Sequence, residues 1–397
     1  MLPKGFVALF LCAFLMGCTA RIVSAPSLQS SGMSAGHWIV QSGQPPHNWV
    51  FLPELPNPAS LPMDIAYGHD GAVWFAEENG QRIGRYAMDG SLTEYPTPGI
   101  YPAYVRPGPD NDMWFNDGSH MIGRVTSSGA VQIYSLGLHY VVDSMNTGPD
   151  KRMWFDADLC FQTCKYYIAE FLSSTGSYRI LNTSCAPQFI GLGADGNLWA
   201  MGPDSSHMET VSASGCQEQV QLPGNQFCCD YGTQIVNAHG NIWLSVIDNP
   251  PVPTVLDYFD TRSRSFTIYP ITIQVTRGPC SAFAERYRQI AEGPDGVVYV
   301  TNCTTHIVRL DTLTGTQLPD LIVQRGPDGM IHGAQDEVIG PDGNLWFTQS
   351  DFYQPQNANA LDVYLIRRMS VSPSTIDFQS VGQSQVATVS ETNYNGA

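Results

Sequence analysis

The stretch Gly340-Pro341-Asp342-Gly343-Asn344-Leu345-Trp346-Phe347 decides the fold of this chain, because close copies of it recur along the sequence. Internal repetition with a period of a few tens of residues is typical of repeat architectures. The successive copies are separated by 40, 40, 45, 44, 56 and 47 residues, measured at the central Asp or at the His that replaces it once. These central residues are Asp70, Asp110, Asp150, Asp195, His239, Asp295 and Asp342.

Each copy predicts a tight turn between two strands. Proline fixes φ for the first corner, Asp can bond its own backbone, and Gly accepts a positive φ. The Trp-Phe segment after the turn has the alternation of a strand, and residues 82–86 and 92–95 predict a third and a fourth strand in the first copy. We therefore expect an all-β protein, a seven-bladed β-propeller with four antiparallel strands per blade. The tryptophans should pack between adjacent blades.

The seventh copy lacks a fourth strand, whereas a strand-like segment, Trp49-Val50-Phe51-Leu52-Pro53, precedes the first copy. This N-terminal strand is expected to pair with residues 364–368 and to close the ring. The pairing would also remove an exposed sheet edge.

The N-terminus predicts export. Lys4 precedes an apolar stretch, residues 5–16, that ends in Leu15-Met16-Gly17-Cys18, the lipobox pattern of bacterial lipoproteins. We expect a lipid on Cys18 that anchors an exported protein in the cell envelope, at the outer membrane or on the periplasmic side. The alternative is an ordinary cleaved signal peptide with an incidental cysteine. No later segment is apolar enough to predict a membrane span.

Four regions follow from these patterns. Residues 1–18 are the lipoprotein signal peptide, 19–46 a linker, and 47–369 the propeller. Residues 370–397 resemble the opening strands of the Ig-like modules of bacterial surface proteins, but are too few for a complete sandwich.

The charge balance restricts the partners. The chain has 19 Lys and Arg against 36 Asp and Glu, which argues against nucleic acid. We expect a monomer that contacts the membrane through its lipid alone and binds a small molecule or a cell-envelope partner.

Eight cysteines remain outside the signal peptide, and an even number in an exported chain predicts disulfide bonds. Zinc is the alternative at Cys160 and Cys164, although no second Cys or His pair at metal spacing follows nearby.

The phrase Gly340 to Thr348, together with Arg82-Ile83-Gly84-Arg85, resembles the streptogramin B (virginiamycin B) lyase family over residues 48–369. The resemblance implies a seven-bladed propeller that opens a cyclic depsipeptide by Mg²⁺-assisted elimination. It further implies a Glu-Pro-His-Gly-Ile signature at one blade entry and a second Glu after that blade's Trp strand. No blade entry of this chain has Glu-x-His, and Glu78 is the one Glu that matches the second position.

The loops between the second and third strands and the connections between blades should share one end of the propeller, which we call the loop-rich face. Candidate ligand-binding residues lie there, and Glu78 and Asp64 are also metal candidates, with Mg²⁺ as the cofactor that the resemblance implies. The candidates are Asp64, Glu78, Tyr104, Asp143, Gln188, Arg288, Asp336 and Glu337.

Two functions fit these observations. One is a lipoprotein propeller that binds a ligand at the loop-rich face without the lyase reaction. The other is a Mg²⁺-dependent lyase or lactone hydrolase with relocated catalytic residues. No catalytic residue can be nominated from the sequence, and the pattern leaves open whether the protein is an enzyme.

The cysteines give a first testable prediction. We expect a local bridge between Cys160 and Cys164 and a second bridge between Cys280 and Cys303. The neighbours Cys228 and Cys229 should have different partners, because a disulfide between adjacent residues is strained. Peptide mass mapping of the non-reduced protein measures these pairings, and free thiols at Cys280 and Cys303 would refute the second bridge.

Overall fold

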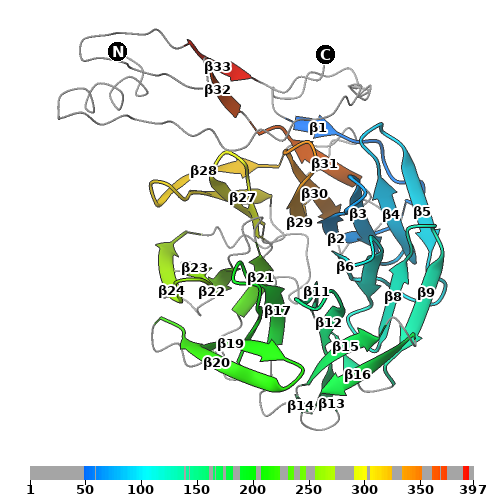
Figure 1. Ribbon diagram of the computed structural model, residues 1–397. Helices are drawn as coiled ribbons and strands as arrows, with labels where there is room; N and C mark the ends of the chain where they lie inside the picture. Colours follow the sequence, from blue (N-terminus) through cyan, green and yellow to red (C-terminus); the bar gives the residue numbers. More distant parts are fainter. Residues whose placement is uncertain are drawn as a thin grey trace. The chain divides into compact units, whose positions relative to one another are not determined.

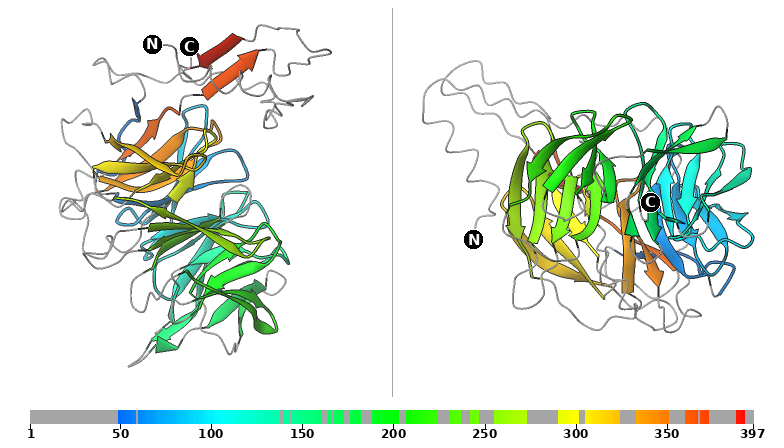
Figure 2. Two further views of the ribbon diagram at one scale, coloured as in Figure 1. Left: turned by 90° about the vertical axis from the view of Figure 1, so that its left-hand side faces the viewer. Right: turned by 90° about the horizontal axis from the view of Figure 1, so that it is seen from below.

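The structure is a computed structural model, and the residues that it describes form strands and no helix. Seven four-stranded antiparallel sheets are arranged as a β-propeller, which confirms the architecture expected from the repeat (Figure 1). Figure 2 shows the twist of the individual sheets from two further directions. The described residues are 49–58, 60–137, 140–142, 144–160, 164–165, 167–172, 176–181, 188–202, 207–223, 231–236, 242–246, 255–272, 290–301, 305–323, 333–350, 360–366, 368–372 and 388–392.

The strands of each blade follow the chain order, except in blade seven. Blade one has β2 (Pro62–Tyr67), β3 (Val73–Glu77), β4 (Arg82–Tyr86) and β5 (Leu92–Pro96). Blade two has β6 (Tyr104–Pro107), β7 (Met113–Asn116), β8 (Met121–Val125) and β9 (Val131–Ser135). Blade three has β11 (Met145–Thr147), β12 (Met153–Asp156), β15 (Ile168–Leu172) and β16 (Ser177–Leu181). Blade four has β17 (Gln188–Leu192), β18 (Leu198–Met201), β19 (His207–Ser212) and β20 (Gly215–Gln221).

The remaining blades follow the same plan. Blade five has β21 (Tyr231–Val236), β22 (Ile242–Val246), β23 (Val255–Asp260) and β24 (Ser265–Pro270). Blade six has β25 (Ile290–Glu292), β26 (Val297–Val300), β27 (His306–Asp311) and β28 (Thr316–Ile322). Blade seven has β29 (Gly333–Ile339), β30 (Leu345–Ser350), β31 (Ala360–Tyr364) and β1 (Trp49–Phe51). The first strand of every blade contacts the first strand of the next, so these seven strands surround the centre.

The N-terminal strand closes the ring. Strand β1 pairs antiparallel with β31, with Trp49 opposite Tyr364 and Phe51 opposite Asp362 (Figure 1). The expected pairing is therefore present, but the partner strand ends at Tyr364 and does not extend to Arg368. The Trp49 ring packs edge-on against Phe347 and Tyr364, with centroid distances of 5.7 and 5.2 Å.

The turn phrase is held by a hydrogen bond that recurs from blade to blade. In blade seven the indole N–H of Trp346 donates to Asp342 Oδ1 at 3.0 Å. The same Asp–Trp pair, four residues apart, is present in blades one, three and four, and in blade six the Tyr299 hydroxyl donates to Asp295. The Asp of the repeat thus satisfies the polar atom of a large buried ring as well as its own turn.

The two glycines of the phrase, Gly340 and Gly343, are required for different reasons. A Cβ on Gly340 would lie 2.5 Å from Cδ1 of Trp346, so only glycine lets the indole pack against the turn backbone. Gly343 has a φ of 70°, a left-handed conformation that glycine adopts without strain.

Tryptophans pack between blades, as expected. Trp74 belongs to an apolar cluster with Val105 and Phe115 of blade two, and Trp346 to one with Ile65 and Phe75 of blade one. Trp114, Trp199, Trp243 and Trp346 are almost completely buried. Burying side chains of this size contributes most of the contact between neighbouring blades.

Arginines cover several of these rings at the turn end of the propeller. In blades one and two the arginine comes from the third strand, where Arg85 stands opposite Trp74 and Arg124 opposite Trp114. In blade four the equivalent place opposite Trp199 is Thr210.

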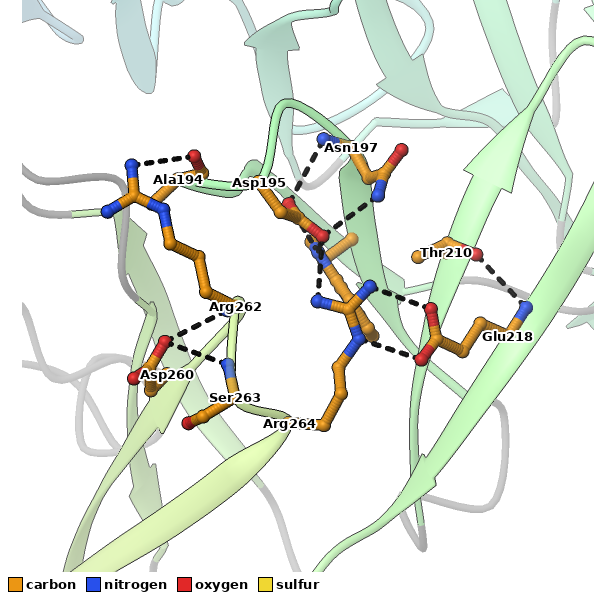
Figure 3. Close-up of polar contacts among 10 residues, drawn as sticks. Ala194, Asp195, Asn197, Thr210, Glu218, Asp260, Arg262, Ser263 and Arg264 are labelled. Atoms are coloured by element: carbon orange, nitrogen blue, oxygen red, sulfur yellow. Dashed lines mark hydrogen bonds and ion pairs between the residues drawn. The ribbon is translucent and has the colours of Figure 1, made fainter.

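Blade five supplies the arginine that blade four lacks. Arg264, in the turn between β23 and β24, lies over the Trp199 ring at 4.8 Å from its centroid. Its guanidinium donates to Asp195 at 2.9 Å and to both oxygens of Glu218 at 2.7 and 2.8 Å (Figure 3). This contact joins blades four and five through charge-assisted hydrogen bonds and a cation–π interaction.

Blade three carries an additional small sheet of β10 (Tyr140–Val141), β13 (Asp158–Cys160) and β14 (Cys164–Lys165). Its register places Cys160 opposite Cys164, as a local bridge between them requires. The bridge itself stays a prediction, and Cys280 and Cys303 lie outside the described residues.

The chain divides into two compact units, Trp38–Leu365 and a second made of Met1–His37 with Ile366–Ala397. Within the second unit, β32 (Arg368–Ser372) and β33 (Thr388–Thr392) form an antiparallel pair. Residues 1–18, where we expect a signal peptide that ends at Cys18, lie outside the described residues. In the described part of the chain, no helix is long and apolar enough to cross a membrane.

The Asp–Trp bond predicts which turn acids stabilise the fold. Replacing Asp342 with Ala leaves the Trp346 indole N–H without its acceptor and should lower the free energy of unfolding by about 1–3 kcal/mol. Asp110 is the matched control, because it is exposed at the equivalent turn of blade two, where no described residue accepts a hydrogen bond from the Trp114 indole N–H. Asp110→Ala should change stability by less than about 0.5 kcal/mol in chemical denaturation. Equal losses in the two variants would contradict this assignment.

Candidate functional site

Two buried carboxyl groups occupy equivalent positions in the first strands of blades one and seven. Asp64 of β2 and Asp336 of β29 each precede the glycine of their turn phrase by four residues. The strand register shifts at both places, between Pro62 and Ile65 and between Ala334 and Glu337. Such an irregularity redirects a side chain away from its own sheet. Both side chains are buried.

These carboxyl groups connect each blade to the next. Asp336 Oδ2 accepts the backbone N–H of Ile65 at 3.1 Å, and Asp64 Oδ2 accepts the backbone N–H of Val105 at 2.6 Å. Ser144 has the equivalent position in blade three, and its hydroxyl oxygen accepts the N–H of Ile190 at 3.1 Å. One sequence position therefore links neighbouring first strands in three places around the ring.

Asp64 and Asp336 also interact with one another and with Arg106 of β6. The Arg106 guanidinium donates to Asp64 Oδ2 at 2.5 Å. Burial, together with the charge of Asp64 and a hydrogen bond to it, raises the pKa of Asp336 well above the usual range. Burial alone would lower the pKa of Arg106, but the charges of Asp64 and Asp336 raise it. Asp336 thus tends to keep a proton that a free aspartic acid would release.

Glu337 follows Asp336 in the chain, but its side chain interacts with blade six. Its carboxyl group accepts the Thr301 backbone N–H at 3.2 Å and the Thr301 hydroxyl. Burial raises the pKa of Glu337 to about 8, even though these bonds favour the charged form.

A second acidic group lies where β3 ends in blade one. Glu77 is completely buried, accepts a hydrogen bond from the Ser60 hydroxyl, and has no partner for Oε1 among the described residues. Burial raises its pKa to about 7, and the charge of Glu94 adds to this. Burial also raises the pKa of the half-buried neighbour Glu78.

The structure brings only part of the expected set together. Asp64, Asp336 and Tyr104 share the junction of blades seven, one and two, since Tyr104 precedes Val105 in β6 and acts electrostatically on Arg106. No hydrogen bond or ion pair connects Glu78 to Asp64 within the described part of the chain. Gln188 begins β17, and its side chain is not described. Asp143 and Arg288 lie outside the described residues.

Sequence reasoning missed Arg106 and Thr301. Arg106 could have been identified from the sequence, because a charged residue inside the first strand of a blade must pair with a polar or oppositely charged group near the centre of the propeller. Thr301 had no such signal, since its role depends on the side-chain direction of Glu337 in the next blade.

The acidic pair does not fit a magnesium ion. Mg²⁺ binds ionised carboxylate oxygens in octahedral geometry. Asp64 directs Oδ2 to a backbone N–H and to the Arg106 guanidinium, whose positive charge opposes a second cation there. Asp336 uses both oxygens as acceptors from Ile65 and Glu337 and retains a proton. In the described part of the chain this leaves Asp64 Oδ1 as the one oxygen of the pair without a hydrogen bond, which is too few for an octahedral ion. Among the described residues, no group of three or more His, Cys, Asp or Glu side chains is arranged to hold a metal ion.

Comparison with known proteins agrees with the repeat. The model of the virginiamycin B lyase family matches residues 50–157, which span blades one and two and the first strands of blade three. This chain resembles that family. No curated protein matches the sequence.

Solved structures extend the likeness to the whole propeller. A catalytically inactive virginiamycin B lyase from Staphylococcus aureus with quinupristin is 20% identical, with a TM-score of 0.60, covering 80% of this chain and 99% of that one. A streptogramin B lyase structure is 19% identical, with the same TM-score and coverage of 80% and 98%. The WD40 propeller domain of Doa1 is 10% identical, with a TM-score of 0.53 and coverage of 79% and 95%. At these identities the structures establish a shared fold.

Proposed function

We propose that this protein is an exported, lipid-anchored propeller that binds a small molecule or a cell-envelope partner at its loop-rich face, without the lyase reaction. One observation supports this most directly. The acids at the junction of blades seven, one and two accept hydrogen bonds from the protein's own N–H groups and from Arg106. Asp64 Oδ2 and both oxygens of Asp336 are used in this way, and only Asp64 Oδ1 has no hydrogen-bond partner among the described residues, so the pair does not supply the several carboxylate oxygens that a catalytic cation needs.

The sequence supports the same proposal independently. A lyase of the resembled type needs a base next to an acidic proton and a cation to hold the developing negative charge. No blade entry supplies the Glu and His of the family signature, and Glu78 alone cannot replace two ligands. Losing the base alone typically costs about a hundredfold to ten-thousandfold in rate.

The lyase reaction can be tested directly. The purified mature protein, incubated with Mg²⁺ and a streptogramin B, should leave the depsipeptide ring closed when the products are followed by mass spectrometry. A virginiamycin B lyase serves as the positive control. Ring opening that is abolished both by chelation and by Glu78→Gln would reject the proposal and place the site at Glu78.

Anchoring is tested at the N-terminus. Mass spectrometry of the mature protein from a bacterial membrane fraction should find a first residue of Cys18 that carries a diacylglyceryl group. Cys18→Ala should lose the lipid. A soluble mature chain that begins after Cys18 in the wild type would instead identify an ordinary signal peptide.

A relocated acid–base reaction is the second candidate function, and Glu77 favours it. Its pKa of about 7 is near the value that suits a general acid or base at neutral pH, and Oε1 has no partner in the described part of the chain. Screening lactones and cyclic depsipeptides against the wild type and Glu77→Gln separates this candidate from ligand binding. Turnover that Glu77→Gln removes would favour the enzyme.

A further inference from the structure

We propose that one proton shared by Asp64 and Asp336 stabilises the junction between blades seven and one, so that the propeller loosens there in alkaline solution. This inference goes beyond the proposed function, because it concerns how the ring of blades is closed and not which ligand the propeller binds.

The geometry places this pair at the point where the two ends of the propeller meet. Strands β29 and β2 are neighbours in space but belong to the last and the first blade. Asp336 crosses this junction through its bond to Ile65 N–H, and Asp64 continues the connection to blade two through Val105 N–H. From the second strand of blade seven, the Thr348 hydroxyl of β30 crosses the same junction by donating to the carbonyl of Met63 in β2 at 2.7 Å.

The charges around Asp336 do not balance if both acids are ionised. Among the described residues, Arg106 is the one cation that acts on the pair, and it bonds to Asp64. The other groups that act on Asp336 or Arg106 are Glu337, on the same strand, and Tyr104 of β6. Two buried carboxylates in hydrogen-bond contact would repel one another, so Asp336 retains a proton.

The direction of the pH effect follows from linkage. In the unfolded chain Asp336 has an ordinary pKa, whereas in the folded protein its pKa is raised. The stability that the shared proton provides is therefore complete at low pH and is lost as the pH rises through the folded-state value. Glu337 acts in the same direction, with loss as the pH passes about 8.

The experiment removes the two acids one at a time. Chemical unfolding is measured from about pH 5 to about pH 10 for the wild type, Glu337→Gln and Glu337→Gln with Asp336→Asn. Asparagine imitates the protonated acid, because its carbonyl oxygen accepts and its amide can donate to Asp64. In the Glu337→Gln background the folding equilibrium constant should fall by up to about tenfold per pH unit between the ordinary pKa of an aspartic acid and the raised pKa of folded Asp336. Adding Asp336→Asn should remove this part of the fall.

Asp64→Asn in the same background is the second variant, used also if Asp336→Asn fails to fold. It removes the neighbouring charge, so the pKa of Asp336 should decrease and the alkaline fall should shrink. Amide hydrogen exchange provides a local measurement. Protection of the Ile65 N–H should decrease at alkaline pH in Glu337→Gln, beyond the intrinsic change, and should not do so once Asp336 is Asn.

Infrared spectroscopy tests the proton itself. The difference spectrum between Glu337→Gln and Glu337→Gln with Asp336→Asn, at neutral pH, should contain the carbonyl band of a buried protonated carboxylic acid, because the contribution of Glu77 cancels between the two variants. The proposal is overturned if Asp336→Asn keeps the full alkaline fall of its background. It is also overturned if added Mg²⁺ abolishes the band at neutral pH, because the pair would then be a cation site.

Discussion

The backbone hydrogen bonds between β1 and β31 join the two ends of the propeller, and the other blades depend on that junction. Each blade buries its apolar faces only against its two neighbours, so an open ring would expose the surfaces between blades seven and one. That interface contains Leu52 and Leu55, which follow β1, together with Phe75 and Trp346. Closing the chain in this way also covers the edge of β31, where free N–H and C=O groups would otherwise be available for intermolecular pairing.

Three contacts, on different strands, stabilise the closure of the ring at blades seven and one. At the outer edge β1 completes the sheet of blade seven. Thr348 of the second strand of blade seven bonds to Met63 of the first strand of blade one, and Asp336 and Ile65 connect the two first strands. The outer contact uses backbone atoms and depends little on side-chain identity, whereas the inner contact depends on an ionisable group. The parts of the ring closure therefore respond differently to a change in solution conditions, and the first strands respond most.

The architecture could be predicted from the sequence because the repeated phrase specifies its local structure. It supplies residues that form a tight turn, a residue that adopts a positive φ, and a large aromatic ring that must be buried. The orphan strand at Trp49 was predictable for the same reason, since a sheet edge without a partner is costly. The candidate site was predictable only in part. Asp64 and Asp336 could be nominated by position, but the raised pKa of Asp336 depends on its burial and on the nearby Asp64 of the next blade. The strand irregularities that accompany this arrangement have no local sequence pattern. Nor does sequence spacing indicate that Glu337, adjacent to Asp336, interacts with blade six.

Arg264 shows that the repeats are not interchangeable. Blades one and two contain both a tryptophan and the arginine that covers it, but blade four contains only Trp199 and receives its arginine from blade five. A gene segment encoding blade four alone would therefore transmit an aromatic ring, Asp195 and Glu218 without the cation that they share. Recombination or duplication within this gene would preserve the contact of Arg264 with blade four only if it copied both repeats together. In this part of the ring, the unit that can be duplicated without losing the contact is therefore a pair of blades.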